Sequence, residues 1–502
     1  MTTTDMTRSC RAPALLLALL CALSLCACAN GSETDRPSES ATGQAASEEE
    51  TADLRYECEL PELNFNDEEI HVLYADKVGR SDELPAEKMG LGVVSDAIYE
   101  RNQLVENMLK VKLDYIPEFE SSVATAQNKD VQGGTGSYDI VVNGVYMAIS
   151  PATQGKYIDL TPLENVDTSK HYWSQGFNEI SFFTSENRQY LATGDAALST
   201  YRLMFMTIYN KTLFENNHEK DLYEVIKNGE WTLDYQLRIL DGHYVDTDGN
   251  NKRSRGDSFG FLTGTCVSTD PYLTAGNARL IVRDEELGEL AYCDDSEKLL
   301  YDLVEKVHNI YQNEATYLFL GSGEDDVGLS FITETFAEGR SMMATIIFWN
   351  MEHSFNELAQ LSYGIAPMPK LSVDQKKYYS YVQDQVSTFG ICASVKNEDR
   401  REMCAAVLEA IMYHSHRLVI PAYYEITLSY RYMQDPESKE ILEIVCDSQA
   451  FDFASECCGL VGSTRALFAS KSNTTASSTK NWKRMLTQQV DKYNKAIDKI
   501  KQ

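Results

Sequence analysis

The sequence predicts an α/β protein built from two or three folding units. Strand-like and helix-like segments alternate along the chain, which is the order expected of a largely parallel sheet covered by helices. Hydrophobic residues make up 43% of the 502 residues and aromatic residues 10%, which is enough apolar surface for a buried core. At roughly 100–200 residues per domain, a chain of this length favours more than one unit.

The N-terminus resembles a bacterial export signal. Arg8 and Arg11 precede an apolar run over 12–25, which has the length of a signal-peptide core and is short for a membrane span. The run ends in Leu-Cys-Ala-Cys28, which resembles the lipobox of lipoproteins. That resemblance implies a signal peptide over 1–27, cleavage before Cys28 and lipidation of its sulfur. The alternative is an ordinary secretory signal in which Cys28 lies near the cut.

Residues 28–54 are rich in Ser, Thr, Gly, Ala and acidic side chains. Such a composition cannot bury a core, and repulsion between like charges keeps the segment extended. We expect an acidic, disordered tether that is lipid-anchored at its start. It would hold a globular body at the extracellular face of the cytoplasmic membrane.

The body begins with short β-rich segments. Residues 70–74 and 111–116 suit strands, and a helix that begins near Ser95 separates them. Residues 138–144 form an apolar run that ends in Asn143-Gly144, which suits a buried parallel strand followed by a loop. Farther along the chain we predict strands at 204–209, 341–348 and 379–386, and helices at 299–312, 397–413 and 481–501.

Several motifs then follow one another in a recognisable order. They are Gln-Tyr-Leu-Ala-Thr-Gly-Asp at 189–195 leading into Tyr-Asn-Lys-Thr-Leu at 209–213, Trp-Thr-Leu-Asp at 231–234, Gly-Arg-Ser-Met-Met-Ala at 339–344 followed by Trp349, Gly-Ile-Ala-Pro-Met-Pro at 364–369, and Pro-Ala-Tyr-Tyr-Glu at 421–425. Behind a lipobox, this order resembles the extracellular solute-binding proteins of ABC transporters, family 1, of the carbohydrate type found in Firmicutes. The resemblance extends from about residue 69 to the end of the chain.

This resemblance implies a type II periplasmic-binding-protein fold, in which two α/β lobes are joined by crossing hinge strands with a ligand cleft between them. Closure of such a hinge is favoured by ligand contacts made to both lobes at once. The implied crossings lie near 199–205, 363–371 and 440–450. Lobe 1 would comprise 55–203 plus 366–440, and lobe 2 would comprise 204–365 plus 441–502.

The resemblance also implies a function. A non-enzymatic, lipid-anchored receptor would capture a small solute, with an oligosaccharide favoured over a peptide or polyamine, and deliver it to the permease subunits of an ABC importer. The expected protein is a monomer that requires no cofactor and meets the membrane only through its anchor. A formal charge of −31 opposes binding to nucleic acid, because a field of this sign repels phosphates.

Ligand-binding residues are expected where aromatic and polar side chains fall near the implied cleft. Sugars present flat C–H faces that stack on aromatic rings, and their hydroxyls bond to carboxylates and amides. Trp349 stands where the family places its stacking aromatic, and Trp231 and Trp482 are expected in the core. The other candidates are Tyr146 after a strand end, Asp195 and Arg202 beside the first crossing, and Asp384 and Gln385 in the recrossing segment.

Two other function classes stay open. A secreted glycoside hydrolase needs a pair of facing carboxylates, and a chain with 76 acidic residues can supply such a pair. A surface adhesive lipoprotein would show the strand spacing of a β-sandwich rather than this α/β order. The sequence contains no His-Glu-x-x-His, Gly-x-Ser-x-Gly, Walker A or Gly-x-Gly-x-x-Gly motif.

The segment 246–257 resembles a calcium loop. Oxygen-bearing side chains fall at loop positions 1, 3, 5, 9 and 12, which are Asp246, Asp248, Asn250, Ser254 and Asp257. Position 6 is Asn251 where a sharp turn favours Gly, and position 12 is Asp rather than the longer Glu. The alternative is a polar turn that is held by Asp and Asn side chains.

Overall fold

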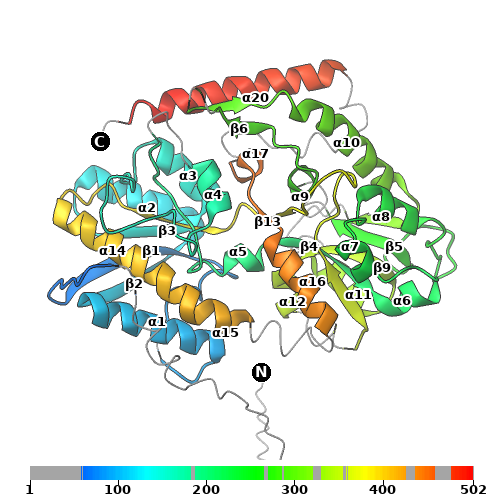
Figure 1. Cartoon of the computed structure of the whole chain (residues 1–502), viewed down its shortest axis with the longest axis horizontal. Helices are drawn as coiled ribbons and strands as arrows, with labels where there is room; N and C mark the ends of the chain where they lie inside the picture. Colours follow the sequence, from blue (N-terminus) through cyan, green and yellow to red (C-terminus); the bar gives the residue numbers. More distant parts are fainter. Residues whose placement is uncertain are drawn as a thin grey trace, which may run out of the picture. The chain divides into compact units, whose positions relative to one another are not determined.

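Two separate β-sheets organise the chain, each flanked by helices (Figure 1). The structure is a computed structural model, and it describes residues 58, 60–86, 88–181, 187–264, 270–284, 286, 288–319, 329–353, 358, 360–424, 436–457 and 476–500. The signal segment, Cys28 and the tether lie outside the described residues. No helix in these ranges is long and apolar enough to cross a membrane.

The first sheet has the order β12-β3-β1-β2. Its strands are β1 (Glu68–Asp76), β2 (Val111–Phe119), β3 (Ile140–Gly144) and β12 (Ser387–Ile391). The first three strands run parallel, and β12 pairs antiparallel with β3. The strands predicted at 70–74, 111–116 and 138–144 are therefore confirmed.

Helices cover both faces of the first sheet. Alternate residues of β1 point to opposite faces, so Val72 and Leu73 belong to different hydrophobic clusters. Helices α1 (Val93–Leu109) and α14 (Glu398–His414) contribute to the Val72 cluster, while α2 (Glu120–Gly133) and α3 (Val145–Thr153) contribute to the Leu73 cluster. This sheet and these four helices are called the first lobe below.

Helix α1 begins two residues earlier than predicted. Gly92 is its N-cap residue, and no side chain caps the helix. Asp96, in the first turn, accepts hydrogen bonds from the backbone N–H groups of Gly90 and Leu91 at 2.7 and 3.2 Å. The carboxylate thus fixes the turn that precedes the helix, whereas Ser95, where the helix was predicted to begin, lies inside its first turn.

The second sheet has the order β10-β4-β9-β5-β8. Its strands are β4 (Phe205–Asn210), β5 (Phe259–Gly264), β8 (Thr316–Phe319), β9 (Ser341–Ile347) and β10 (Tyr363–Ala366). The strands predicted at 204–209 and 341–348 are confirmed. Every residue of β4, β5 and β9 is buried, as expected for strands with helices on both faces.

Eight helices accompany the second sheet, and together they form the second lobe. They are α6 (Lys211–Asn216), α7 (Leu222–Lys227), α8 (Leu233–Leu240), α9 (Asp270–Ala275), α10 (Ser296–Gln312), α11 (Leu329–Ala337), α12 (Phe348–His353) and α16 (Pro436–Asp447). Thr232 caps α8 by accepting a hydrogen bond from the Tyr235 N–H. Trp231 before it is buried, and its indole N–H donates to the Pro367 carbonyl at 2.9 Å, so its predicted core role is confirmed.

Three chain segments lie side by side between the lobes. Met204, between α5 (Ser199–Arg202) and β4, forms a bridge with Val382. Next to it, β11 (Ser380–Tyr381) pairs in parallel with β13 (Gln449–Ala450). The rings of Phe205 and Tyr381 stack at 5.7 Å, which ties two of the connections together.

Two crossings differ from the predicted positions. Residues 367–379 stay with the second lobe, because the Lys370 N–H donates to the Trp231 carbonyl at 3.1 Å and the Tyr378 hydroxyl donates to the Ile226 carbonyl at 3.1 Å. The second crossing is therefore made by 380–386, later than the predicted 363–371. In this segment only Ser380–Tyr381 is a strand, instead of all of 379–386.

The C-terminal part also enters the second lobe earlier than predicted. Glu437 of α16 lies 3.6 Å from Lys227, so this helix joins the second lobe at residue 436 rather than near 440–450.

The remaining elements are α4 (Gln175–Ser181), β6 (Ile281–Arg283), β7 (Leu290–Tyr292), η1 (Ser415–Val419, a π-helix), α15 (Ile420–Tyr424), α17 (Phe453–Glu456) and α20 (Ala476–Ile497).

The C-terminal helix α20 contacts both α3 and the β6–β7 hairpin, and it runs along the top of Figure 1. One stripe of this helix packs on the core, since Leu486, Val490, Tyr493 and Ile497 are buried, whereas Met485 is exposed. The helix begins at Ala476, five residues before the predicted start at 481.

Candidate functional site

The carboxyl ends of the parallel strands bring charged residues to one edge of the first sheet. Asp76 at the end of β1 is in register with Phe119 at the end of β2. Lys77 and Glu120 follow directly, and Lys77 Nζ lies 2.8 Å from Glu120 Oε2. In open α/β sheets, ligands bind at this edge.

Arg80 lies buried in the same edge, with 3% of its surface exposed. It pairs with Glu120 through Nη2, while Nε and Nη1 have no hydrogen-bond partner among the residues that the structure describes. A Cβ built on Gly144 would lie 2.4 Å from Arg80 Nη1, so a glycine at the end of β3 is what leaves room for the guanidinium. Burial lowers the pKa of Arg80, and Glu120 and Glu83 oppose that shift. A buried cation with two unused N–H donors can bond a hydroxyl or carbonyl oxygen of a ligand.

The second lobe presents Trp349 to this edge. Trp349 belongs to α12, which follows directly from β9. Its ring lies against the backbone of Gly79, where an ideal Cβ would be 3.6 Å from Trp349 Cδ2. Gly79 has a φ of +88°, a conformation that favours glycine. The predicted stacking residue thus touches a loop of the first lobe.

Arg202 connects the loop after β1 with helix α12. Its guanidinium donates to both carboxylate oxygens of Asp82, at 2.8 and 3.1 Å, and Nε lies 3.4 Å from Glu352 Oε2. Its Cζ is 5.5 Å from the centre of the Trp349 ring. Burial opposes the charged guanidinium, but Glu352 and Asp82 outweigh it and raise the pKa of Arg202. Asp82 follows β1 and Glu352 belongs to α12, so this ion pair network joins the two lobes.

Three of the other sequence-predicted residues lie close to this network. Tyr146 is 38% exposed, and its backbone N–H donates to the Asp384 carbonyl at 3.0 Å. Gln385 has a buried side-chain oxygen without a hydrogen-bond partner, and its carbonyl lies 3.2 Å from the Cβ position of Gly144. Tyr146, Asp384 and Gln385 therefore gather at the end of β3, beside Arg80.

Asp195 lies apart from them. Its Oδ2 is 2.6 Å from Nδ1 of His416, and it lines a separate cavity of about 230 Å³ that none of the other five predicted residues lines. Burial raises the pKa of Asp195, and the hydrogen bond with His416 opposes the shift.

Sequence reasoning missed Arg80, Glu120, Asp82 and Glu352. The available signal was the rule that selected Tyr146, namely that residues after parallel strands share one edge. Applied to the ends of β1 and β2, it would have found Arg80 and Glu120.

The buried carboxyl group of Glu83 links the loop after β1 to Ser199 in α5 and to Ser387 at the start of β12. Glu83 is 1% exposed, and it accepts hydrogen bonds from the Ser199 N–H and, at 2.7 Å, from the Ser387 hydroxyl. The Ser387 N–H in turn donates to the Ser199 hydroxyl at 3.0 Å. Burial raises the pKa of Glu83 to about 7, although these hydrogen bonds and Arg202 lower it.

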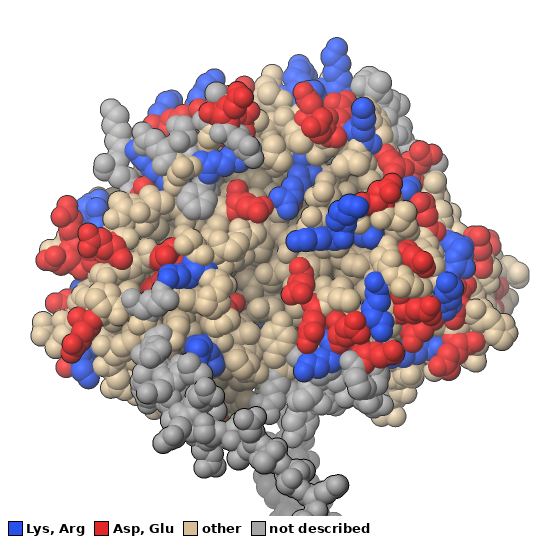
Figure 2. All heavy atoms as spheres, viewed as in Figure 1, with Lys and Arg blue, Asp and Glu red and all other residues tan. Residues whose placement is uncertain are grey.

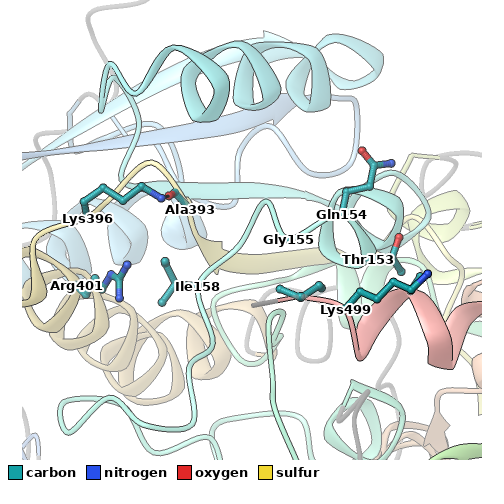
Figure 3. A pocket seen from close by; sticks show the side chains of 10 residues that line it. Thr153, Gln154, Gly155, Ile158, Ala393, Lys396, Arg401 and Lys499 are labelled. Atoms are coloured by element: carbon teal, nitrogen blue, oxygen red, sulfur yellow. Dashed lines mark hydrogen bonds between the residues drawn. The ribbon is translucent and has the colours of Figure 1, made fainter. Parts of the chain in front are cut away.

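A different hollow, of about 500 Å³, lies beneath the end of α20 (Figure 3). Lys396 and Arg401 line one side of it, and Lys499, Gln154 and Thr153 line the other. None of the predicted ligand-binding residues lines it.

On the face shown in Figure 2, carboxylates gather over the helices of the second lobe, while the middle is lined mostly by uncharged atoms.

The predicted calcium loop brings three carboxylates together. One oxygen from each of Asp246, Asp248 and Asp257 lies within 4.8 Å of the others. Asp246 also accepts hydrogen bonds from the N–H groups of Gly249 and Asn251, both at 2.8 Å. Asn251 has a φ of +56°, so it occupies the left-handed position that the loop requires.

Comparison with known proteins identifies solved structures that share this architecture. No protein-family model and no curated protein matches the sequence. Among solved structures, a cyclo/maltodextrin-binding protein complexed with maltotetraose aligns over 87% of this chain and 99% of its own, with a TM-score of 0.51 and 12% identity. A sugar transporter from Rhizobium etli, in an open conformation, aligns over 86% of this chain and 100% of its own, with a TM-score of 0.51 and 13% identity.

The chain shares the fold of both proteins. The predicted fold class, α/β with the architecture of substrate-binding proteins, is thereby confirmed. The network around Trp349, Arg202 and Arg80 lies where residues of the two lobes meet.

Proposed function

We propose that the protein is an extracellular, lipid-anchored solute-binding protein that captures an oligosaccharide and delivers it to the permease subunits of an ABC importer. The observation that carries the proposal is the meeting of the two lobes at Trp349, Gly79 and Arg202. Residues from both lobes surround one edge, so a ligand seated there would contact both lobes. The fold shared with a maltotetraose-bound protein supports a sugar as the ligand.

The chemistry of the edge suits a sugar. Trp349 offers an aromatic face, and Tyr146 a second, partly exposed ring. Arg80 supplies unused N–H donors, and Glu120 and Asp82 supply acceptors for hydroxyls. Sugar sites combine such rings with a few polar groups of fixed orientation.

The proposal is tested by titrating the purified body, residues 55–502, with maltotetraose and with xylo-, cello- and galacto-oligosaccharides in a calorimeter. We expect saturable one-site binding to at least one of them and no new reducing ends after prolonged incubation. Hydrolysis of the bound sugar would instead identify a glycoside hydrolase. The absence of binding across a wide glycan array would contradict the sugar assignment.

The anchor gives a separate prediction. Replacing Cys28 by serine removes the sulfur that would be acylated, so the protein should move from the membrane fraction to the medium in a Gram-positive host. Multiple acyl chains hold a protein far more firmly than one chain does, and the shift should therefore be nearly complete. Cys26→Ser is the matched control and should leave the protein on the membrane. A Cys28→Ser protein that stays membrane-bound would contradict lipid anchoring.

We also propose that the loop over 246–257 binds calcium as a structural ion. Millimolar Ca²⁺ should then raise the melting temperature, because an ion that binds only the folded state stabilises it. Asp248→Asn should remove this rise, whereas Asp284→Asn, on another surface turn, should retain it. An identical melting temperature with calcium and with EDTA would favour a simple polar turn.

A further inference from the structure

Two histidines from distant parts of the chain meet beside the cavity that Asp195 lines. His171 precedes α4, and His416 belongs to the π-helix η1. Their Nε2 atoms lie 3.2 Å apart, and their rings are nearly perpendicular, at 82°. The two imidazoles thus approach each other through the same nitrogen, Nε2.

Asp195 fixes the orientation of one of these rings. Its Oδ2 lies 2.6 Å from His416 Nδ1, so the proton of the neutral ring stays on Nδ1 and the Nε2 lone pair is free to accept. Asp195 is itself held in place, because its backbone N–H donates to the Tyr172 carbonyl at 3.0 Å. A carboxylate on the remote nitrogen of a histidine is the usual second contact of metal-binding histidines.

The spacing of the two nitrogens fits a shared ion. Tetrahedral zinc holds imidazole nitrogens at about 2.0–2.1 Å, which places two of them about 3.4 Å apart. The adjoining cavity, of about 230 Å³ and lined also by Tyr201 and Gln449, has room for waters that would complete the coordination. The π-helix adds weight, since an inserted turn of this kind occurs frequently at functional sites.

We propose that His171 and His416, oriented by Asp195, form a binding site for a borderline transition-metal dication such as Zn²⁺. Imidazole nitrogen suits zinc, copper and nickel, whereas calcium and magnesium require oxygen ligands. Two protein ligands leave the other positions to water, so the site is open and exchangeable.

Metal binding here needs only a tautomer change. Without an ion, the His171 Nε2–H donates to the His416 Nε2 lone pair. When the ion takes both Nε2 atoms, the proton of His171 moves through solvent to its Nδ1, which is feasible because His171 is exposed. The tautomer change itself neither adds nor removes a proton.

The same chain offers a matched control. His71 Nδ1 lies 3.0 Å from Asp114 Oδ2, which reproduces the histidine–carboxylate contact, and no hydrogen bond joins His71 to a second imidazole in the described part of the chain. Comparison of His71→Ala with His171→Ala therefore separates a two-histidine site from adsorption at any histidine.

The experiment titrates the metal-free protein, under reducing conditions that do not chelate zinc, with ZnCl₂ in a calorimeter and with CoCl₂ in a spectrophotometer. We expect one binding site. Its dissociation constant should rise at least tenfold in each of the variants His171→Ala, His416→Ala and Asp195→Asn. His71→Ala should bind as the wild type does, and the Zn²⁺-induced rise in melting temperature should disappear only in the first two variants. Binding that survives in the double variant His171→Ala/His416→Ala would overturn the proposal and assign the ion to thiols or carboxylates elsewhere.

Discussion

Replacing Trp349 by alanine is expected to weaken oligosaccharide binding by about 1–3 kcal/mol, or roughly 5- to 150-fold in the dissociation constant. The ring lies on the backbone of Gly79 and within 5.5 Å of the Arg202 guanidinium. Its removal takes away the aromatic face that the proposed site offers to a sugar ring. Calorimetry with a sugar that the wild type binds measures the loss.

Two further variants separate loss of the ligand contact from loss of the fold. Trp349→Tyr keeps an aromatic face and should recover part of the affinity. Trp482→Ala removes an indole that packs on the core from α20, so it should change the melting temperature and leave the affinity unchanged. Equal affinities for Trp349→Ala and the wild type, with both proteins folded, would place the ligand elsewhere.

Glu83→Gln is expected to remove a pH dependence of stability. Burial raises the pKa of Glu83 from 4.5 to about 7, so the folded state binds this proton more tightly than the unfolded state does. The resulting contribution is fully present below pH 4.5 and is lost as the pH rises through 7, a change of about 3 kcal/mol. Glutamine keeps the neutral shape of the protonated acid and can still accept from Ser199 and donate to Ser387.

The measurement is the melting temperature of both proteins between pH 5 and pH 8. The difference in favour of Glu83→Gln should grow as the pH rises across this window. Glu62→Gln, which removes an exposed carboxylate of the same region, should follow the wild type at every pH. Parallel curves for Glu83→Gln and the wild type would show that Glu83 stays ionised throughout.

Much of the fold could be predicted because buried strands carry a strong local signal. The apolar run that ends at Asn143-Gly144 is β3, and the strand expected at 341–348 is β9. Where tertiary contacts decide, the prediction failed. The segment 379–386 has a strand-like composition, yet only Ser380–Tyr381 forms a strand, because β13 offers it two residues to pair with and Val382 meets Met204 only as an isolated bridge.

The site was predictable only in part for a related reason. Trp349 was predicted from a local motif and Arg202 from its place beside the first crossing, and both lie in the network that joins the lobes. Arg80 and Glu120 meet because β1 and β2 end at the same level, so finding them requires the rule for parallel strands rather than a local motif. The position of Asp195 depends on His416, a residue far along the chain, so its sequence neighbourhood could not reveal its partner.

The pairing of β12 with β3 affects the order in which the protein can fold. Ser387 of β12 is in register with Gly144 of β3, so one edge of β3 has no partner until most of the chain has been synthesised. Contacts this distant in sequence form slowly, because a long loop must close before they stabilise the structure. A growing chain therefore keeps one edge of β3 unpaired until Ser387–Ile391 has been made, and the first sheet is completed only after the whole of the second sheet has been synthesised.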